Sequence, residues 1–198
     1  LYDLNLTLAD IESRLLREWS NPGTKQLDRD GWAWKFTKDT SGEVELTVTF
    51  DGDDKEVRGL VRARNVGVVE SYEDMGMDGG DGVEAYPWDD MGYDDWQCNE
   101  AVYNLAQRVG EESPWDLWRI EFSNVAQALR KRGIGTAMYE AVLGRIRKNG
   151  GPVFVSSDGC VHRGETSAAA RATWAKLVAT RHYPFIKTRK GLYVVYVK

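Results

Sequence analysis

The stretch from Val125 to Ala137 constrains the fold of this chain more than any other. Three basic residues, Arg130–Arg132, precede two glycines, Gly133 and Gly135, and an apolar run at helical spacing follows. This pattern predicts a helix that begins at the glycines. Amides at a helix start lack internal partners, the helix dipole favours negative charge there, and glycine allows close approach. The sequence therefore predicts a phosphate-binding turn, which we call the cradle (residues 130–136).

Two common phosphate-binding motifs do not fit the cradle. A dinucleotide-binding G-x-G-x-x-G motif needs a third glycine at position 138, which is Met138. The G-x-x-x-x-G-K-[ST] loop of nucleotide-hydrolysing proteins is absent from the sequence. Because two closely spaced glycines also occur in ordinary turns, the surrounding elements must decide what the cradle binds.

Length and composition predict one soluble domain over residues 1–198. The chain has 198 residues, of which 42% are hydrophobic, and no apolar run approaches the roughly 20 residues of a membrane span. Two cysteines, Cys98 and Cys160, make a disulfide framework improbable and favour a cytoplasmic location. Cys160, His162 and His182 match no standard zinc spacing, so we expect isolated residues and no metal.

Charge is divided along the chain. Residues 126–198 hold 14 Lys+Arg and 3 Asp+Glu, whereas residues 1–125 hold 12 and 28. Between positions 70 and 100 there are eleven acidic residues and no Lys or Arg, and the pattern does not fit a calcium-binding loop. Five Tyr and Trp residues there argue against full disorder. We interpret residues 70–113 as a partly ordered acidic insertion and a candidate lid.

Hydrophobic periodicity predicts the other elements. A capped helix spans about residues 7–19 and ends at Asn21-Pro22-Gly23, and strands near 32–36, 44–50 and 57–69 form an antiparallel meander. A helix over 100–109 precedes a strand over 115–125. On this strand we expect alternate residues to share a face: Trp118, Ile120 and Phe122 on one face, and Glu121, Ser123 and Val125 on the other. The cradle helix runs to about 148, and a strand at 153–155, a helix from 166 or 167 to about 180, and a hairpin of 185–186 with 192–197 follow.

This order, together with the cradle, resembles the GNAT superfamily of acyl-coenzyme-A-dependent N-acetyltransferases. Val125 and the run Arg130-Lys131-Arg132-Gly133-Ile134-Gly135 match the coenzyme-A motif of that family in spacing. The resemblance implies an α/β (α+β) fold with a mixed, mostly antiparallel central sheet flanked by helices. Residues 166–174 also resemble GNAT-like proteins encoded by tailed phages, for which the host cytoplasm would be the location.

The resemblance also implies acetyl-CoA as co-substrate, with no metal. Amides between Arg130 and Thr136, including those of Gly133, Ile134 and Gly135, would hold the pyrophosphate. The backbone of Val125 would bond the pantetheine arm as a strand would. Lys131 and Arg132 would meet the 3′-phosphate. The alternative to phosphate binding is that Arg130–Arg132 are solvent-exposed residues at the start of a helix.

The chemistry that the resemblance implies is direct attack of a neutral amine on a thioester. Glu121 is the candidate base, with a paired structural carboxylate as the alternative; in place of Glu121, Ser123 would hold a water. The family's tyrosine acid is replaced by Trp174, so Tyr183 becomes the candidate acid, with a core or loop tyrosine as the alternative. The family's asparagine is also missing; Ser156, Ser157 and Asp158 occupy its neighbourhood.

Two functions from different classes follow. The first is acetyl transfer from acetyl-CoA to a primary amine of a cationic acceptor, such as a protein lysine or N-terminus, a polyamine or an amino-sugar. The acidic segment would attract such an acceptor. The second is a GNAT-fold binding protein without turnover that grips a basic protein partner through its acidic aromatic segment. Nucleic acid is an unlikely partner because the acidic half would repel phosphate.

Overall fold

A computed structural model describes residues 21–50, 53–69, 93–127, 130–157, 166–188 and 191–198 of the chain. The described helices are α2 (Pro22–Arg29), α3 (Tyr93–Val109), α4 (Ile134–Gly150) and α5 (Ala168–Arg181). The strands are β1 (Ala33–Asp39), β2 (Glu43–Phe50), β3 (Asp53–Val69), β4 (Trp115–Val125), β5 (Val153–Ser156), β6 (Phe185–Lys187) and β7 (Tyr193–Val197). The helix predicted over residues 7–19 lies outside these ranges.

The seven strands form one sheet in the order β1-β2-β3-β4-β5-β7-β6. The β4–β5 pair is parallel and the other five neighbouring pairs are antiparallel. The parallel pair needs a crossover, which α4 supplies, whereas the antiparallel pairs β1–β2 and β2–β3 are joined by short connections. The predicted meander, β-α-β unit and terminal hairpin are confirmed, as is a mixed α/β fold with a mostly antiparallel sheet.

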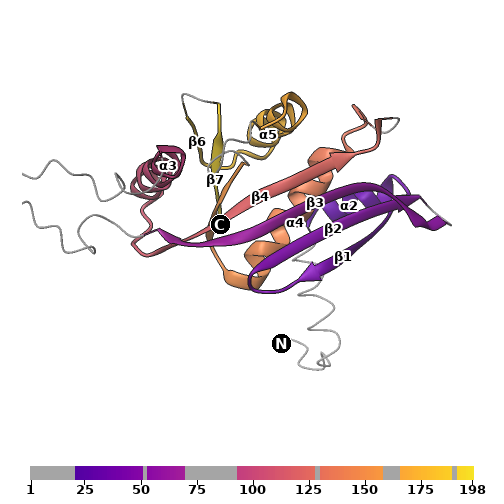
Figure 1. Cartoon of the computed structure of the whole chain (residues 1–198), viewed down its shortest axis with the longest axis horizontal. Helices are drawn as coiled ribbons and strands as arrows, with labels where there is room; N and C mark the ends of the chain where they lie inside the picture. The colour runs from indigo at the N-terminus through magenta and orange to yellow at the C-terminus, as the bar shows by residue number, and fades with distance from the viewer. Residues whose placement is uncertain (1–20, 51–52, 70–92, 128–129, 158–165, 189–190) are drawn as a thin grey trace, which may run out of the picture.

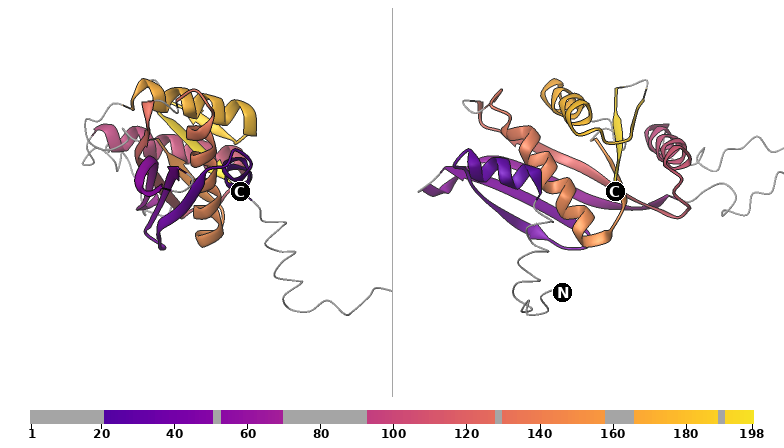
Figure 2. Two further views of the ribbon diagram at one scale, coloured as in Figure 1. Left: turned by 90° about the vertical axis from the view of Figure 1, so that its right-hand side faces the viewer. Right: turned by 180° about the vertical axis from the view of Figure 1, so that it is seen from behind.

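Helices cover both faces of the sheet (Figures 1 and 2). Helices α2 and α4 pack side by side behind β1–β4, as the rear view of Figure 2 shows. Alternate strand residues meet different helices: Val155 of β5 belongs to the core under α4, whereas its neighbour Phe154 packs in the cluster with α3. We call the face under α4 the inner face and the opposite one the outer face.

The turn Asn21-Pro22-Gly23 begins helix α2, which was not predicted, whereas the helix that it was expected to end lies outside the described residues. The Asn21 side chain accepts a hydrogen bond from the Gly23 amide at 2.8 Å, and Pro22 occupies the first helical turn, where its missing amide hydrogen costs nothing. Asn21 Nδ2 also donates to the carbonyls of Glu140 and Ala141 at 2.8 and 3.0 Å. These bonds hold the start of α2 against the middle of α4.

Two other expectations need correction. Helix α3 begins at Tyr93 rather than Glu100, and residues 70–92 lie outside the described ranges. Cys98 on α3 is disulfide-bonded, so the expectation that the two cysteines form no disulfide framework was wrong for this residue; Cys160 is not among the described residues. In the part of the chain that the structure describes, every helix is too short or too polar to cross a bilayer.

Candidate functional site

The sheet splits between β4 and β5. These strands pair only at Leu117–Arg119 with Phe154–Ser156, and β4 then continues to Val125 beyond the end of β5. The amide of Ala126 donates to the Arg58 carbonyl at 2.7 Å on the β3 side. Because peptide groups alternate in direction along a strand, the backbone groups of Val125 and Ser123 face away from β3, toward the split.

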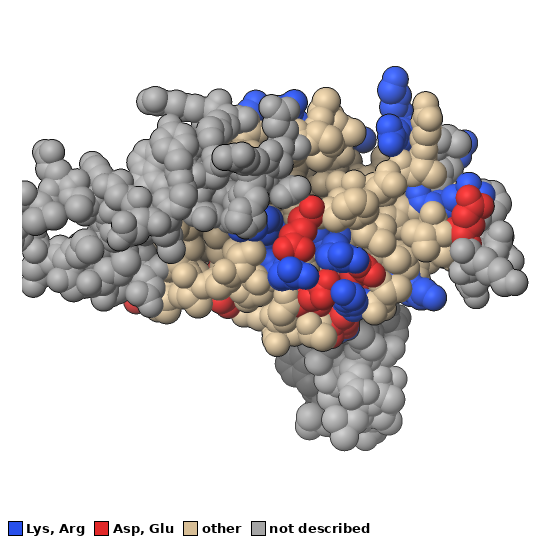
Figure 3. All heavy atoms as spheres, viewed as in Figure 1, with Lys and Arg blue, Asp and Glu red and all other residues tan. Residues whose placement is uncertain are grey.

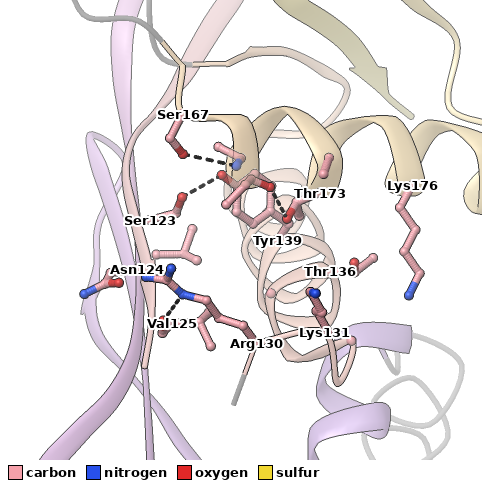
Figure 4. A pocket seen from close by; sticks show the side chains of 16 residues that line it. Ser123, Asn124, Val125, Arg130, Lys131, Thr136, Tyr139, Ser167, Thr173 and Lys176 are labelled. Atoms are coloured by element: carbon pink, nitrogen blue, oxygen red, sulfur yellow. Dashed lines mark hydrogen bonds between the residues drawn. The ribbon is translucent and has the colours of Figure 1, made fainter. Parts of the chain in front are cut away.

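A pocket of about 410 Å³ occupies this split. Its walls are the unpaired end of β4, the start of α4 and the first half of α5 (Figure 4). The lining includes three basic residues, Arg130, Lys131 and Lys176, and no Asp or Glu among the described residues. This pocket therefore favours an anionic ligand.

The predicted helix start at the cradle is confirmed. Helix α4 begins after Gly133, whose φ of 84° is left-handed and favours glycine, and no side chain caps this end of the helix. A Cβ atom placed on Gly133 would lie 3.1 Å from Gln26 Nε2 and 4.0 Å from Lys176 Nζ. A hydrogen-bond donor and a cation thus converge on the same uncapped turn, where the helix dipole is positive.

The structure brings together most of the predicted cofactor residues. Val125, Arg130, Lys131, Gly133, Gly135 and Thr136 all line the pocket. Ile134 instead places its side chain in the core, with 2% exposed, and Arg132 is exposed and does not line the pocket. Arg130 Nε donates to the Val125 carbonyl at 3.1 Å, so it covers a backbone group that faces the split.

A β-bulge in β4 changes the faces that its residues occupy. Ile120 pairs with Ala63 and Phe122 with Arg62, which leaves Glu121 as the extra residue. Ser123 pairs with Val61 and therefore shares the inner face with Ile120. The shared faces predicted for Glu121 with Val125 and for Phe122 with Ile120 were wrong, because strict alternation does not hold across a bulge.

A second pocket of about 150 Å³ adjoins the first. Both are lined by Ser123, Tyr139, Ser167 and Ala170, and the smaller one adds Glu121, its one carboxylate among the described residues. Glu121 Oε1 lies 3.5 Å from Arg64 NH1, so the carboxylate has an ion-pair partner. The basic pocket and the carboxylate pocket thus meet at a junction of hydroxyl groups.

The hydroxyl pair at this junction includes a residue that the sequence did not single out. The phenol of Tyr139 donates to Ser123 Oγ at 2.8 Å (Figure 4). Its ring, only 2% exposed, packs edge-on against Trp174, with the ring centroids 5.3 Å apart. Tyr139 lies one helical turn after Gly135, on the side of α4 that faces the pocket. That spacing was a signal available in the sequence.

Tyr183 does not reach the junction. It follows the left-handed residue His182, beyond the end of α5, and lines neither of the two pockets. Burial raises the pKa of its phenol, and the nearby Glu140 carboxylate adds to the rise. Glu140, with 2% exposed, is itself paired with Arg181 through a 2.9 Å bond from NH2 to Oε2.

The two serines at the end of β5, Ser156 and Ser157, make structural hydrogen bonds. Ser156 Oγ donates to the Trp118 carbonyl at 3.3 Å, and Ser157 Oγ accepts from the Tyr193 amide at 2.9 Å. Asp158 lies outside the described residues. Among the residues that the structure does describe, no three His, Cys, Asp or Glu side chains gather in a group suited to a metal ion.

No protein-family model matches the chain, and no curated protein matches its sequence. A crystal structure of a protein described as an acetyltransferase of the GNAT family, from Desulfovibrio desulfuricans, is similar with a TM-score of 0.34 and 13% identity over 78% of this chain and 67% of that one. Nourseothricin acetyltransferase is similar with a TM-score of 0.32 and 13% identity, over 78% and 63%. Similarity this low establishes neither family nor activity, and it does not bear on the resemblance to phage proteins.

Proposed function

We propose that this protein is an N-acetyltransferase that moves the acetyl group of acetyl-CoA to a primary amine of a cationic acceptor. One observation supports this proposal above the others: a single pocket joins an uncapped, basic helix start to an unpaired strand edge. Coenzyme A combines the two features that such a pocket would recognise, a cluster of phosphates and an extended arm with two amides.

The described residues fit this co-substrate. Lys131 and Lys176 would meet phosphate oxygens together with the amides of the first turn of α4. The backbone groups of Ser123 and Val125 that face the split would form hydrogen bonds with the amides of the coenzyme A arm, as a neighbouring strand does. Arg130 now covers the Val125 carbonyl, and pairing at that carbonyl would release its guanidinium for the phosphates.

The junction of the two pockets suits the transfer itself. Bound acetyl-CoA supplies an activated acyl thioester, and Glu121 would take one proton from the acceptor ammonium so that a neutral amine attacks. Ser123 accepts the hydrogen bond of Tyr139, which leaves its own hydroxyl hydrogen to be directed at the departing sulfur. As the C–N bond forms and the C–S bond breaks, the second amine proton passes to that sulfur, so charge and protons balance.

Tyr139, rather than the predicted Tyr183, is the tyrosine at the junction. The phenol is at the junction, hydrogen-bonded to Ser123, whereas Tyr183 lines neither pocket. Trp174 lines the smaller pocket and is fully buried, and its indole packs against the Tyr139 ring rather than replacing a phenol. We therefore propose that Glu121 and Ser123 act on the reacting groups and that Tyr139 orients the Ser123 hydroxyl.

The cationic acceptor is proposed from charge. Eleven acidic residues and no basic ones between positions 70 and 100 would raise the local concentration of an ammonium compound, with an effect that weakens in salt. The alternative function, binding of a basic protein without turnover, rests on the same segment, most of which lies outside the described residues. The described geometry favours the transferase.

Labelled acetyl-CoA and a panel of amines test the proposal. We expect transfer to at least one cationic amine, and a loss of turnover in Glu121→Gln with unchanged affinity for coenzyme A, measured by isothermal titration calorimetry. A stability increase on adding millimolar coenzyme A would report binding independently of turnover. Absence of transfer to every amine, with wild type and Glu121→Gln indistinguishable, would contradict the proposed activity.

A further inference from the structure

The ring of Phe122 is half exposed although folding favours its burial. Its exposed fraction is 50%, whereas Ile120, two residues earlier on the same strand, is 2% exposed in the core. The bulge at Glu121 causes this difference because it turns Phe122 from the inner to the outer face. The exposed ring is therefore an apolar surface that a ligand can contact.

Phe122 lies beside the smaller pocket. Phe122 and Glu121 both line that pocket, and the bulge places the two residues side by side there. Bulges beside active sites commonly re-aim side chains in this way. The mouth of the pocket therefore combines an apolar surface with a carboxylate.

Several charged side chains elsewhere on the outer face form ion pairs. Basic and acidic side chains lie interleaved over the meander, as Figure 3 shows. Arg62 NH2 is 2.6 Å from Glu45 Oε2, and Lys38 Nζ is 2.9 Å from Glu43 Oε1. The Glu121–Arg64 pair is longer, at 3.5 Å, and half of the Arg64 side chain is exposed. Such an exposed pair contributes little, so a ligand ammonium can replace Arg64 at small cost.

We propose that the acceptor is a primary alkylammonium compound whose methylene chain lies on the Phe122 ring while its ammonium meets Glu121. This inference rests on the proposed function and specifies its substrate class. Lysine side chains and linear polyamines both carry an ammonium on a methylene chain. An amino-sugar carries its amine directly on a polar ring and lacks the chain that Phe122 would contact.

The test compares two amines that differ only in chain length. For wild type, we expect kcat/KM to be at least tenfold higher with n-butylamine than with methylamine, because three added methylenes contact the ring. In Phe122→Ser this preference should fall about tenfold, whereas Phe122→Leu should keep most of it. Val57→Ser is the matched control, since Val57 is 53% exposed on the same sheet and lines neither pocket.

Further measurements separate this inference from the proposed function. Coenzyme A affinity by calorimetry should be equal in wild type and Phe122→Ser. Equal butylamine preference in the two proteins, with coenzyme A still bound, would overturn the role of Phe122 and leave the transferase intact. Transfer to cadaverine or to a lysine peptide supports the inference and identifies the source of the amine, whereas transfer confined to amino-sugars overturns it.

Discussion

Replacing Gly135 by alanine should stabilise the folded protein and weaken its binding of coenzyme A. Gly135 is the second residue of α4, and a Cβ atom there would lie 3.6 Å from Thr173 Oγ1 and 3.8 Å from Val125 Cγ2, both ordinary contacts. The protein can therefore accept the methyl group. Alanine is favoured over glycine in helices by about 0.5–1 kcal/mol, which corresponds to a rise in Tm of roughly 1–4 °C for a chain of this size.

The same methyl group would occupy space in the pocket. It would stand between β4 and α5, where the backbone must approach an anion closely. We expect the affinity for coenzyme A to fall at least tenfold, or about 1.4 kcal/mol. Calorimetric titration and urea unfolding without ligand measure the two effects separately.

Gly150→Ala is the matched control for this experiment. Gly150 is the last residue of α4, and a Cβ atom there would meet only Val153 Cγ1, at 3.9 Å, far along the helix from the cradle. This variant should leave coenzyme A affinity unchanged. If Gly135→Ala is stabilised but binds coenzyme A like wild type, the cradle does not bind that ligand.

Three further predictions follow from the geometry. Lys176→Ala should weaken coenzyme A binding about tenfold at low salt and less at 0.5 M salt. Lys187 lies outside the pocket, so Lys187→Ala should leave the affinity unchanged. Titrations at both salt concentrations check both expectations. Tyr139→Phe should lower kcat by about tenfold or more without changing coenzyme A affinity, and equal kcat in steady-state assays would refute its role. The hydrogen bond from Arg145 lowers the pKa of Asp39. The ionised Asp39 carboxylate therefore stabilises the fold above its unfolded-state pKa, and this stabilisation is lost as pH falls through its folded-state pKa. Urea unfolding at several pH values should show that Asp39→Asn loses less stability in acid than wild type does.

Local patterns predicted the elements that depend on nearby residues. Gly133 marked the start of α4 because a left-handed residue at a helix end favours glycine, and Ser167 marked the start of α5, where its side chain accepts from the Ala170 amide at 3.2 Å. Trp174, Leu177 and Val178 are buried on one face of α5, and their spacing in the sequence is that of one helical face. In each case the signal and the structure lie within a few residues.

Features that depend on strand pairing or on distant segments were not predictable in this way. The bulge at Glu121 is defined by the register of β4 against β3, which alternation along one strand does not contain. Lys176 joins the cradle only because α5 packs beside the start of α4. Asn21-Pro22-Gly23 carries signals for both an end and a start, and its contacts with Glu140 and Ala141 lie more than a hundred residues away.

The three-residue seam between β4 and β5 gives this sheet an unpaired edge in its middle rather than at its margin. Unpaired edges attract other strands, and proteins commonly protect them with charged side chains. Arg130 does so here, because its guanidinium occupies the Val125 carbonyl. An extended ligand that displaced the arginine from this carbonyl would pair with the unpaired end of β4 and link the two halves of the sheet.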